Sequence, residues 1–357
     1  MTIGAAAASL QKPDLRSMDL DDLTGVMERM GEKPFRASQL FDWLHHRLAE
    51  SPDDMNNLPK ALREKLKAEY HCVPLKTVRV KESALDGTRK YLLELGDNNV
   101  IECVRMEYED WSSVCISSQV GCAMGCRFCA STLDGCVRNL TAGEMLEEVY
   151  AISRAGDKRI SNVVVMGSGE PLLNLDNLLK FIRLLTHEKG LNLSQRGITV
   201  STCGIVPGIY ALAEEKLGIT LAISLHAADD ETRKSLMPVA STYSLKDLMT
   251  ACRDYFHKTG RRLSFEYALI DGVNDREIDA ERLSKLIRGM KAHVNLIPVN
   301  PVKERNFQRS SPDSIRKFKT KLEKNGINVT IRRELGRDID GSCGQLRRTY
   351  MEDSDKC

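Results

Sequence analysis

The sequence predicts an α/β protein built on a parallel sheet that is either open or curled into a partial barrel. From residue 111 onward, short strands rich in β-branched residues alternate with amphipathic helices, which is the pattern of consecutive βα units. The chain has 357 residues, and 42% of them are apolar, enough for two or three domains with a large core. In folds of this class the chemistry lies at the carboxyl ends of the strands.

The N-terminal part follows other patterns. A polar, alanine-rich leader (1–19) precedes a helical module (20–72), in which helices are expected at 20–30, 35–48 and 59–70. Acidic residues at the start of the first helix and Pro59 at the start of the third support these boundaries. Residues 73–110 form a β-rich connector, with strands expected at 77–80, 90–95 and 99–106.

The main domain spans residues 111–335, and a C-terminal segment (336–357) follows it. Strands are expected at 113–118, 162–166, 197–201, 218–224, 263–269, 293–298 and 328–332. Helices are expected at 142–155, 175–186, 244–257, 279–290 and 311–324. Helices of this length between short strands indicate βα units around a parallel sheet.

Composition excludes several classes of protein. Lys and Arg (52) nearly balance Asp and Glu (50), so a nucleic-acid partner must be met by local charge. No segment approaches the roughly 18 apolar residues of a membrane span. The first ten residues lack the positive region of a secretory signal, so we expect a cytoplasmic protein. Eleven cysteines, an odd number, argue against a fully paired disulfide framework and for thiols, metal ligands or catalysts.

The sharpest motif is a CxxxCxxC in the loop after the first strand of the main domain. Cys122, Cys126 and Cys129 are close enough in sequence to bind one iron–sulfur cube and to leave its fourth iron without a protein ligand. Phe128 supplies partial apolar shielding. A tetrahedral zinc site is the alternative, with Cys136 or Cys115 as its fourth ligand, but the spacing is not that of a zinc ribbon.

Small or polar residues follow several of the expected strands. Glycines after the strand at 162–166 allow the backbone to approach a ligand, and a carboxylate beside them accepts hydrogen bonds from a cationic amine. Hydroxyls at two successive strand ends suit ribose and carboxylate contacts, although such residues are as often only caps. The residues selected on these grounds are Gly169, Glu170, Ser201, Ser224, Leu225, His226 and Asn300.

Three further residues lie outside these motifs. Cys343 is flanked by Gly and Ser, which makes it a poor core residue, whereas Cys115 in an apolar strand is as readily a buried thiol. Glu102 lies in the apolar strand 99–106, where a carboxylate either faces solvent or is functional. Glu107 and Glu109 are rivals for the same role.

The CxxxCxxC with an aromatic residue before its last cysteine resembles the radical S-adenosylmethionine (SAM) enzymes. The resemblance implies a partial (β/α)6 barrel and a [4Fe-4S] cluster on Cys122, Cys126 and Cys129. It also implies that SAM binds the open iron and cleaves, after electron transfer, to a 5′-deoxyadenosyl radical. Gly169 and Glu170 would then bind the amino group of SAM, and the remaining strand-end residues would contact SAM as well: Ser201, Ser224, Leu225, His226 and Asn300.

A closer resemblance extends over residues 20–348. The segments VCISSQVGC, GEPLLN, LMPV, FEY, DGVND and NLIPVNP, with CGQL around Cys343, are similar to the RNA adenine-C2 methyltransferases of the RlmN family. The resemblance implies methylation of carbon 2 of adenosine 2503 in 23S rRNA and of adenosine 37 in tRNAs. It implies an external electron donor of the flavodoxin type, and neither DNA nor a membrane as a partner.

Carbon 2 of adenine is electron-poor and has no nucleophilic lone pair, so ordinary methyl transfer from SAM has nothing to attack with. The resemblance implies that Cys343 is first methylated by one SAM and that the radical from a second SAM abstracts hydrogen from this methyl group. The methylene radical adds to carbon 2. Cys115 removes the carbon-2 proton and joins Cys343 in a transient disulfide, which an external reductant resets. The family assigns Glu102 as proton acceptor, in competition with Cys115.

Two other functions are weighed against this one. The related adenine-C8 rRNA methyltransferases, which confer antibiotic resistance, share the three cluster cysteines and both catalytic cysteines. A non-catalytic iron–sulfur or zinc protein that binds RNA is the alternative from another class. For the RNA itself, the helical module is a candidate grip. Basic residues cluster at Lys303, Arg305, Arg309, Arg316, Lys317, Lys319, Lys321, Lys324, Arg332, Arg333, Arg337, Arg347 and Arg348.

Overall fold

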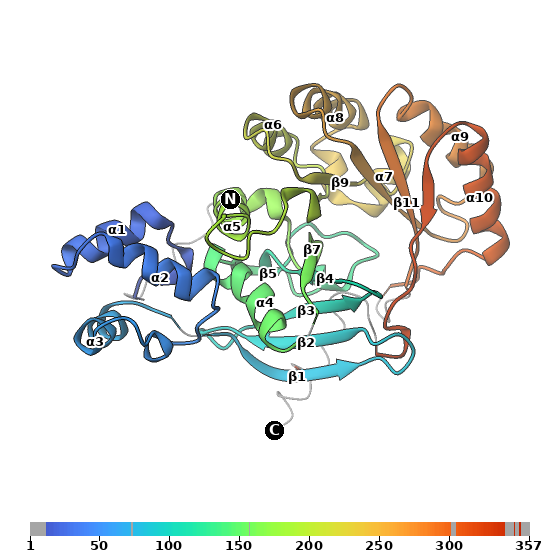
Figure 1. Ribbon diagram of the computed structural model, residues 1–357. Helices are drawn as coiled ribbons and strands as arrows, with labels where there is room; N and C mark the ends of the chain where they lie inside the picture. Colours follow the sequence, from blue (N-terminus) through green and yellow to red (C-terminus); the bar gives the residue numbers. More distant parts are fainter. Residues whose placement is uncertain are drawn as a thin grey trace.

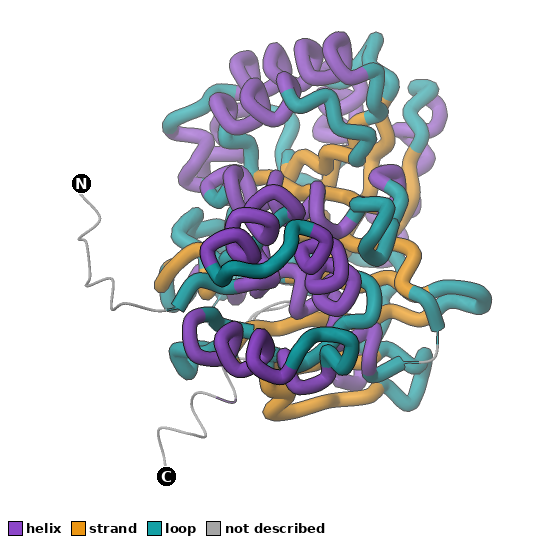
Figure 2. Tube along the Cα trace, turned by 60° about the vertical axis from the view of Figure 1, so that its left-hand side comes forward, coloured by secondary structure: helices purple, strands orange, loops and turns teal. Residues whose placement is uncertain are grey.

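The computed structural model describes residues 12–72, 74–156, 158–300 and 305–339, together with Leu346 and Tyr350. Three helices at the N-terminal end lie beside a long curved sheet, and further helices cover the outer face of that sheet (Figure 1). Figure 2 brings the N-terminal side forward and shows the helices wrapped around the strands. Within the described residues, no helix is long and apolar enough to cross a membrane.

The N-terminal helices are α1 (Leu20–Arg29), α2 (Phe35–His45) and α3 (Lys60–Glu69). A capping box in which Asp19 and Asp22 bond each other's backbone N–H begins α1. Helix α2 ends three residues before the expected boundary at 48. Leu48 has a φ of +56°, a left-handed conformation that no α-helix continues through.

The connector strands are β1 (Lys76–Glu82), β2 (Arg89–Glu94) and β3 (Val100–Glu107), and they form an antiparallel meander. β3 also pairs antiparallel with β4 (Ser112–Ile116), the first strand of the main domain. The connector is therefore continuous with the main sheet.

Beyond β4 all neighbouring strands of the main sheet are parallel, in the order β4-β7-β8-β9-β10-β11-β12. The predicted α/β class is confirmed, and the sheet curves from β3 through β7 to β11 without β1 pairing β12 (Figure 1). The added strands are β7 (Ile160–Val165), β8 (Ile198–Thr202), β9 (Thr220–Ser224), β10 (Leu263–Leu269), β11 (Ala292–Pro298) and β12 (Val329–Ile331).

The helices that connect these strands confirm all five expected helices and add two. They are α4 (Ala142–Arg154), α5 (Leu175–Leu185), α6 (Val206–Glu214), α7 (Asp230–Leu236), α8 (Leu245–Thr259), α9 (Glu277–Leu286) and α10 (Pro312–Lys324). Helices α6 and α7 were not predicted. α6 begins with a Pro-Gly pair, and α7 is only seven residues long and mostly charged, so neither shows a clear apolar stripe.

A two-stranded hairpin, β5 (Gln119–Gly121) and β6 (Cys136–Asn139), stands apart from the main sheet. The strand expected to end at residue 118 ends at Ile116 instead. There the Ser117 N–H donates to the Glu148 carboxylate, at 3.2 and 3.0 Å, and the Ser118 N–H donates to the Ser168 carbonyl at 2.8 Å. These bonds replace the ladder and send the chain into the hairpin.

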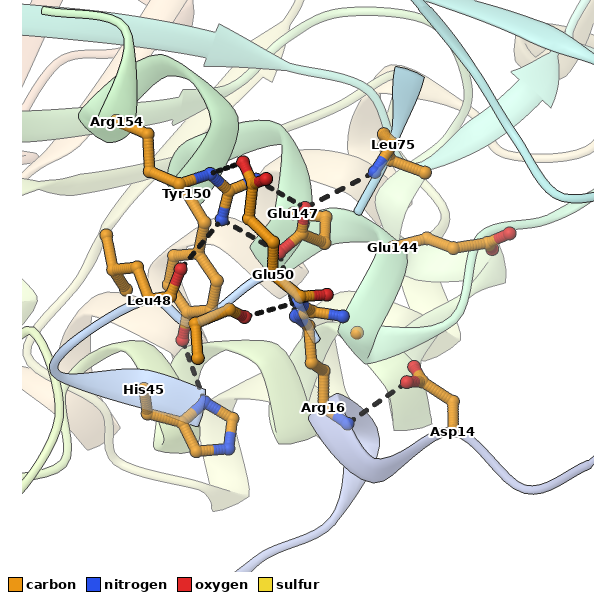
Figure 3. Close-up of polar contacts among 12 residues, drawn as sticks. Asp14, Arg16, His45, Leu48, Glu50, Leu75, Glu144, Glu147, Tyr150 and Arg154 are labelled. Atoms are coloured by element: carbon orange, nitrogen blue, oxygen red, sulfur yellow. Dashed lines mark hydrogen bonds and ion pairs between the residues drawn. The ribbon is translucent and has the colours of Figure 1, made fainter. Parts of the chain in front are cut away.

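A buried ion pair joins the turn before α1 (Leu15–Ser17) to α4 (Figure 3). Arg16 Nε lies 2.8 Å from one oxygen of Glu147, and Arg154 Nη2 lies 2.9 Å from the other. His45 of α2 shares a hydrogen bond of 2.8 Å with the Tyr150 hydroxyl, and both side chains are buried. These contacts fix the N-terminal helices against the main domain.

Candidate active site

The three motif cysteines lie in the loop between β5 and β6, which holds them beside the carboxyl ends of the parallel strands. Gly121 and Gly135 close this loop, because the Cys122 N–H donates to the Gly135 carbonyl at 2.7 Å. Gly121 has a φ of +77°, and a Cβ there would lie 2.1 Å from the Gly135 oxygen. The loop therefore requires glycine at this position.

The loop packs on an apolar floor built from the ends of several strands. Cys122 and Cys126 are buried, and Cys129 is half-buried. Met124, Phe128 and Cys129 pack against this floor, which excludes water from the inner side of the loop. The apolar floor consists of Cys126, Cys203, Leu236, Met237, Val239, Ile270 and Val299.

The thiol environment fits a cationic metal group. Burial raises the pKa of Cys122 to about 11 and raises the pKa of Cys126 further, so thiolates persist here only with a positive partner. Among the described side chains, no three of the His, Cys, Asp and Glu type converge on a single ion. The three thiolates of a four-iron cluster bind three different iron atoms, and their short spacing in an apolar, glycine-containing loop suits that group.

The loop after β7 packs directly on the chain that leads into the hairpin. Gly169 has a φ of +108°, and a Cβ there would lie 2.6 Å from the Gln119 Cβ, so the two segments touch backbone to side chain. Glu170 is 2% exposed. One of its oxygens accepts from the Cys203 N–H at 2.7 Å and the other from the Leu172 N–H at 3.0 Å. Burial raises the pKa of this carboxyl, partly offset by the Cys203 hydrogen bonds.

Two of the selected hydroxyls meet across neighbouring strands. Ser201 at the end of β8 and Ser224 at the end of β9 have oxygens 3.4 Å apart, and both residues are half-buried. Leu225 is fully buried and its N–H donates to the Glu266 carbonyl at 3.0 Å. Asn300 follows β11 and is exposed. The structure therefore places all these residues at one edge of the sheet.

His226, just after β9, links this edge of the sheet to β10. It has a φ of +56°, and its Nδ1 accepts from the Ala268 N–H at 2.9 Å. Burial lowers the pKa of the imidazole to about 3, with a smaller contribution from the Arg233 cation, so the ring is neutral. Phe128 of the cysteine loop packs edge-on against this ring at 4.7 Å between centroids. The loop and the strand ends are thus in direct contact.

An asparagine that the sequence analysis assigned no role of its own holds the same edge. Asn274 Nδ2 donates to the His226 carbonyl at 2.7 Å and to the Ala268 carbonyl at 2.6 Å. Its Oδ1 accepts from the Ile270 N–H at 2.8 Å. The side chain is 1% exposed and satisfies three backbone groups of the β9 and β10 ends. Its place in the DGVND segment was the available signal.

Glu102 and Cys115 lie on one face of the sheet. Ile101, Cys103, Val114 and Ile116 belong to the main core, so the alternating residues point to the opposite face. Val104 pairs with Cys115 across β3 and β4, and Glu102 precedes Val104 by two residues on that face. Both side chains are buried, at 7% and 5% exposure.

A buried lysine, also assigned no role from the sequence, accompanies Glu102. Lys90 on β2 is fully buried, and its Nζ lies 3.0 Å from Glu102 Oε2. The alternation of strand 89–94 places it on the same face, but a Lys in an amphipathic strand gives no sequence signal of burial. Glu107 instead pairs with Arg105 at 3.3 Å, and Cys103 lies in the core.

Cys343 lies outside the described residues, as do Lys303, Arg347 and Arg348. The described chain on either side of Cys343 contacts the connector strands. Asp338 accepts from the Ser83 hydroxyl at 2.6 Å and from the Ala84 N–H at 2.9 Å. Leu346 is buried with Leu92 and Val100, on the face that carries Glu102.

The expected basic surface is partly neutralised. On α10, Arg316 and Lys317 pair with Asp313, and Lys319 pairs with Glu323. Arg309 pairs with Glu334. Arg332, Arg333 and Arg337 are exposed, beside the end of β12 and the following segment.

Comparison with known proteins points to a single family. Residues 116–282 match the radical SAM superfamily, and residues 13–72 match the ribosomal RNA large subunit methyltransferase N-terminal domain. A probable dual-specificity RNA methyltransferase RlmN of Lachnospira eligens is 58% identical over 343 residues, covering 96% of this chain and 98% of its own. One from Lachnoclostridium phytofermentans is 55% identical and covers 96% of each chain. The crystal structure of a radical SAM methyltransferase from Sphaerobacter thermophilus is similar with a TM-score of 0.89 and 44% identity, covering 93% of this chain and 98% of that one.

Proposed function

Because this chain belongs to the RlmN family of radical SAM RNA methyltransferases, which use a [4Fe-4S] cluster and SAM, we propose that it methylates carbon 2 of adenine in RNA. The substrates in this proposal are adenosine 2503 of 23S rRNA and adenosine 37 of tRNAs. The observation that carries it is the shared face of Glu102 and Cys115 on β3 and β4, the two paired strands that precede the cysteine hairpin in the chain.

In this proposal Cys122, Cys126 and Cys129 hold the cluster. Once bound there and reduced, the cluster would supply the electron that cleaves SAM to the adenosyl radical, which would take hydrogen from a methyl group on Cys343. The contact between Phe128 and His226 supports placing the SAM-binding residues beside the loop. Those residues are Gly169, Glu170, Ser201, Ser224, Leu225, His226 and Asn300.

Cys343 carries the transferred carbon. Its thiolate accepts a methyl group from one SAM, and the activated carbon then forms a bond to carbon 2 of adenine. Glu102 or Cys115 takes the proton that leaves carbon 2, and the unpaired electron of the radical adduct would pass back to the oxidised cluster. Attack of the Cys115 sulfur on the Cys343 sulfur forms an S–S bond and breaks the S–C bond, whose electron pair stays on the transferred carbon and is protonated to a methyl group. The two cysteines end oxidised, so an external reductant restores them.

The RNA partner needs a positive surface and an unstacked base. The exposed Arg332, Arg333 and Arg337 carry charge that supports phosphate contacts beside the site. The target adenine must leave its stack to reach a site at the strand ends. The N-terminal helices, held against α4 by the buried Arg16–Glu147 pair and the His45–Tyr150 hydrogen bond, are the proposed grip for the rest of the RNA. A flavodoxin-type protein is the proposed electron donor.

The test is anaerobic turnover with reconstituted enzyme on 23S rRNA fragments and on tRNA separately, with nucleoside mass spectrometry of the products. We expect 2-methyladenosine from both RNAs. Methylation of carbon 8 alone would assign the chain to the other branch of the family. Absence of SAM cleavage after reduction would favour a non-catalytic RNA-binding protein.

A matched pair of variants tests the face shared by Glu102 and Cys115. Cys115→Ala leaves nothing to break the S–C bond, so we expect no released product and a covalent enzyme–RNA adduct visible by denaturing electrophoresis. Cys103→Ala changes a buried thiol on the opposite face of the sheet, one residue from Glu102, and should keep methylation. Equal loss in both variants would contradict the assignment of Cys115.

A further inference from the structure

Arg233 of α7 is a fully buried cation close to the cysteine loop. Its Nη2 donates to the Cys203 carbonyl at 2.7 Å, and its Nε donates to the Leu225 carbonyl at 3.2 Å. These carbonyls follow β8 and β9, the strands that carry Ser201 and Ser224 near their carboxyl ends. Its Nη1 is buried and has no hydrogen-bond partner among the residues that the structure describes.

Arg233 lacks the acid that other buried cations have. Within the described chain, four Lys or Arg side chains are buried: Arg16, Lys90, Arg105 and Arg233. The first three pair with Glu147, Glu102 and Glu107, whereas no carboxylate of the described residues lies within ion-pair distance of Arg233. A guanidinium stays charged in proteins, and a buried charge without a counter-charge is strongly destabilising.

The cysteine loop contacts α7, the helix that carries Arg233. The Arg127 N–H of that loop donates to the Leu236 carbonyl at the end of α7, at 2.9 Å. Cys126, Cys203 and Leu236 pack together in the apolar floor. Burial lowers the pKa of Arg233, and the strongest opposing interactions are those with the Cys203 and Cys126 sulfurs. α7 therefore presents its buried cation to the loop that carries the proposed ligands.

We propose that Arg233 is the counter-charge of the iron–sulfur cluster and raises the potential at which the cluster is reduced. The inference rests on the proposed ligation by Cys122, Cys126 and Cys129. Three thiolates outweigh the positive charge of the iron–sulfide core, and reduction adds one more negative charge. A buried cation stabilises the reduced form more than the oxidised form, because the local dielectric is low. Its two carbonyl contacts also tie the cluster to the strand ends proposed to hold SAM.

The potential of the cluster is measured without SAM or RNA, and SAM binding to each variant is measured separately. Wild type, Arg233→Gln, Arg233→Lys and Arg105→Gln are reconstituted anaerobically and assayed for iron per chain. Each is then titrated against potential by electron paramagnetic resonance. Arg105→Gln is the matched control, since Arg105 is an equally buried arginine that has its own carboxylate and lies on β3 beside Ser112, at the opposite end of β4 from the loop.

We expect Arg233→Gln to bind iron and to show an about tenfold lower ratio of reduced to oxidised cluster at fixed potential, which is 59 mV for a one-electron couple. Arg233→Lys and Arg105→Gln should stay within about twofold of wild type. A wild-type potential in Arg233→Gln would overturn the proposal. So would an unchanged potential with weakened SAM binding, which would make the SAM carboxylate the partner of Arg233.

Arg233→Lys decides the question if Arg233→Gln does not fold, because it keeps the charge. A tenfold drop in its ratio of reduced to oxidised cluster, or failure to bind iron, would overturn the counter-charge role. Failure of the wild-type protein to bind iron is a separate result. It would refute the ligand assignment of the three cysteines.

Discussion

Two buried arginines of this protein are held in opposite ways. At the contact between the N-terminal helices and α4, Arg16 lies against Glu147, whose second oxygen binds Arg154 (Figure 3). Beneath the cysteine loop, Arg233 meets only two backbone carbonyls among the described residues. Both side chains are at most 1% exposed, so both have lost their hydration.

The α4 contact around Arg16 stabilises the fold, whereas in our proposal Arg233 stabilises a bound group. At the α4 contact the chain supplies both signs of charge, so the ion pairs are complete without any ligand. At the cysteine loop the chain supplies the cation, and in our proposal the cluster supplies the anion. A buried charge left unpaired in this way costs stability, and such sites are where function is expected.

The largest effect expected at the loop is a loss of function with little loss of fold. Cys126→Ser removes a proposed cluster ligand, so we expect loss of iron and no detectable methyl transfer. Cys252→Ser, at a fully buried thiol of α8, is the control with the same atomic change. Both variants should lose about 1–3 kcal/mol of stability from burying a hydroxyl. Iron retained at the wild-type level in Cys126→Ser would contradict the assignment of Cys126 as a cluster ligand.

The largest effect expected at the α4 contact is a loss of fold without loss of cluster binding. Glu147→Ala leaves Arg16 buried without its acid, and we expect a loss of about 3–5 kcal/mol in urea unfolding. Glu323→Ala breaks the exposed pair with Lys319 on α10 and should cost about 0–1 kcal/mol. Iron per folded chain should be unchanged in both. A loss below 1 kcal/mol for Glu147→Ala would show that this contact is not what stabilises the interface.

A smaller loss of stability should appear on acidification, and one histidine in each of the two regions contributes to it. Burial lowers the pKa of His45 at the α4 contact and of His226 at the site, each to about 3. The unfolded chain takes up these protons near pH 6.5 and the folded chain does not, so stability is present above that pH and falls below it. From pH 7.5 to 5, each histidine should cost about 2 kcal/mol.

The His45→Gln variant measures how much His45, at the α4 contact, contributes to the pH dependence of the unfolding free energy. Its unfolding free energy, measured by urea titration at both pH values, should fall by about 2 kcal/mol less than that of wild type, with the His226 share left in place. An identical pH dependence in variant and wild type would mean that His45 is protonated in the folded protein.

Features that depend only on residues close together in the sequence were predicted correctly. Strands β4 to β12 of the main sheet and the five longer connecting helices show the right period over short windows, and the CxxxCxxC is a local spacing. The predictions were wrong where contacts between residues distant in sequence determine the local structure. Strand 113–118 stops at Ile116 because Glu148 of α4 and Ser168 after β7 bind the backbone beyond it. Helix α7, with Asp230, Glu231 and Lys234, has the composition of an exposed turn, yet Arg233 within it is fully buried.

By itself the sequence determined the α/β class and the family and named the candidate residues for radical methyl transfer, because these depend on residue type and local spacing. Only the tertiary structure decided which of those residues meet. The pairing of β3 with β4 puts Glu102 and Cys115 on one face, and the parallel neighbours β8 and β9 bring Ser201 to 3.4 Å from Ser224. The absence of an acid beside Arg233 in the described chain is likewise a property of packing. Burial and charge pairing arise between segments far apart in the chain, so no local pattern encodes them.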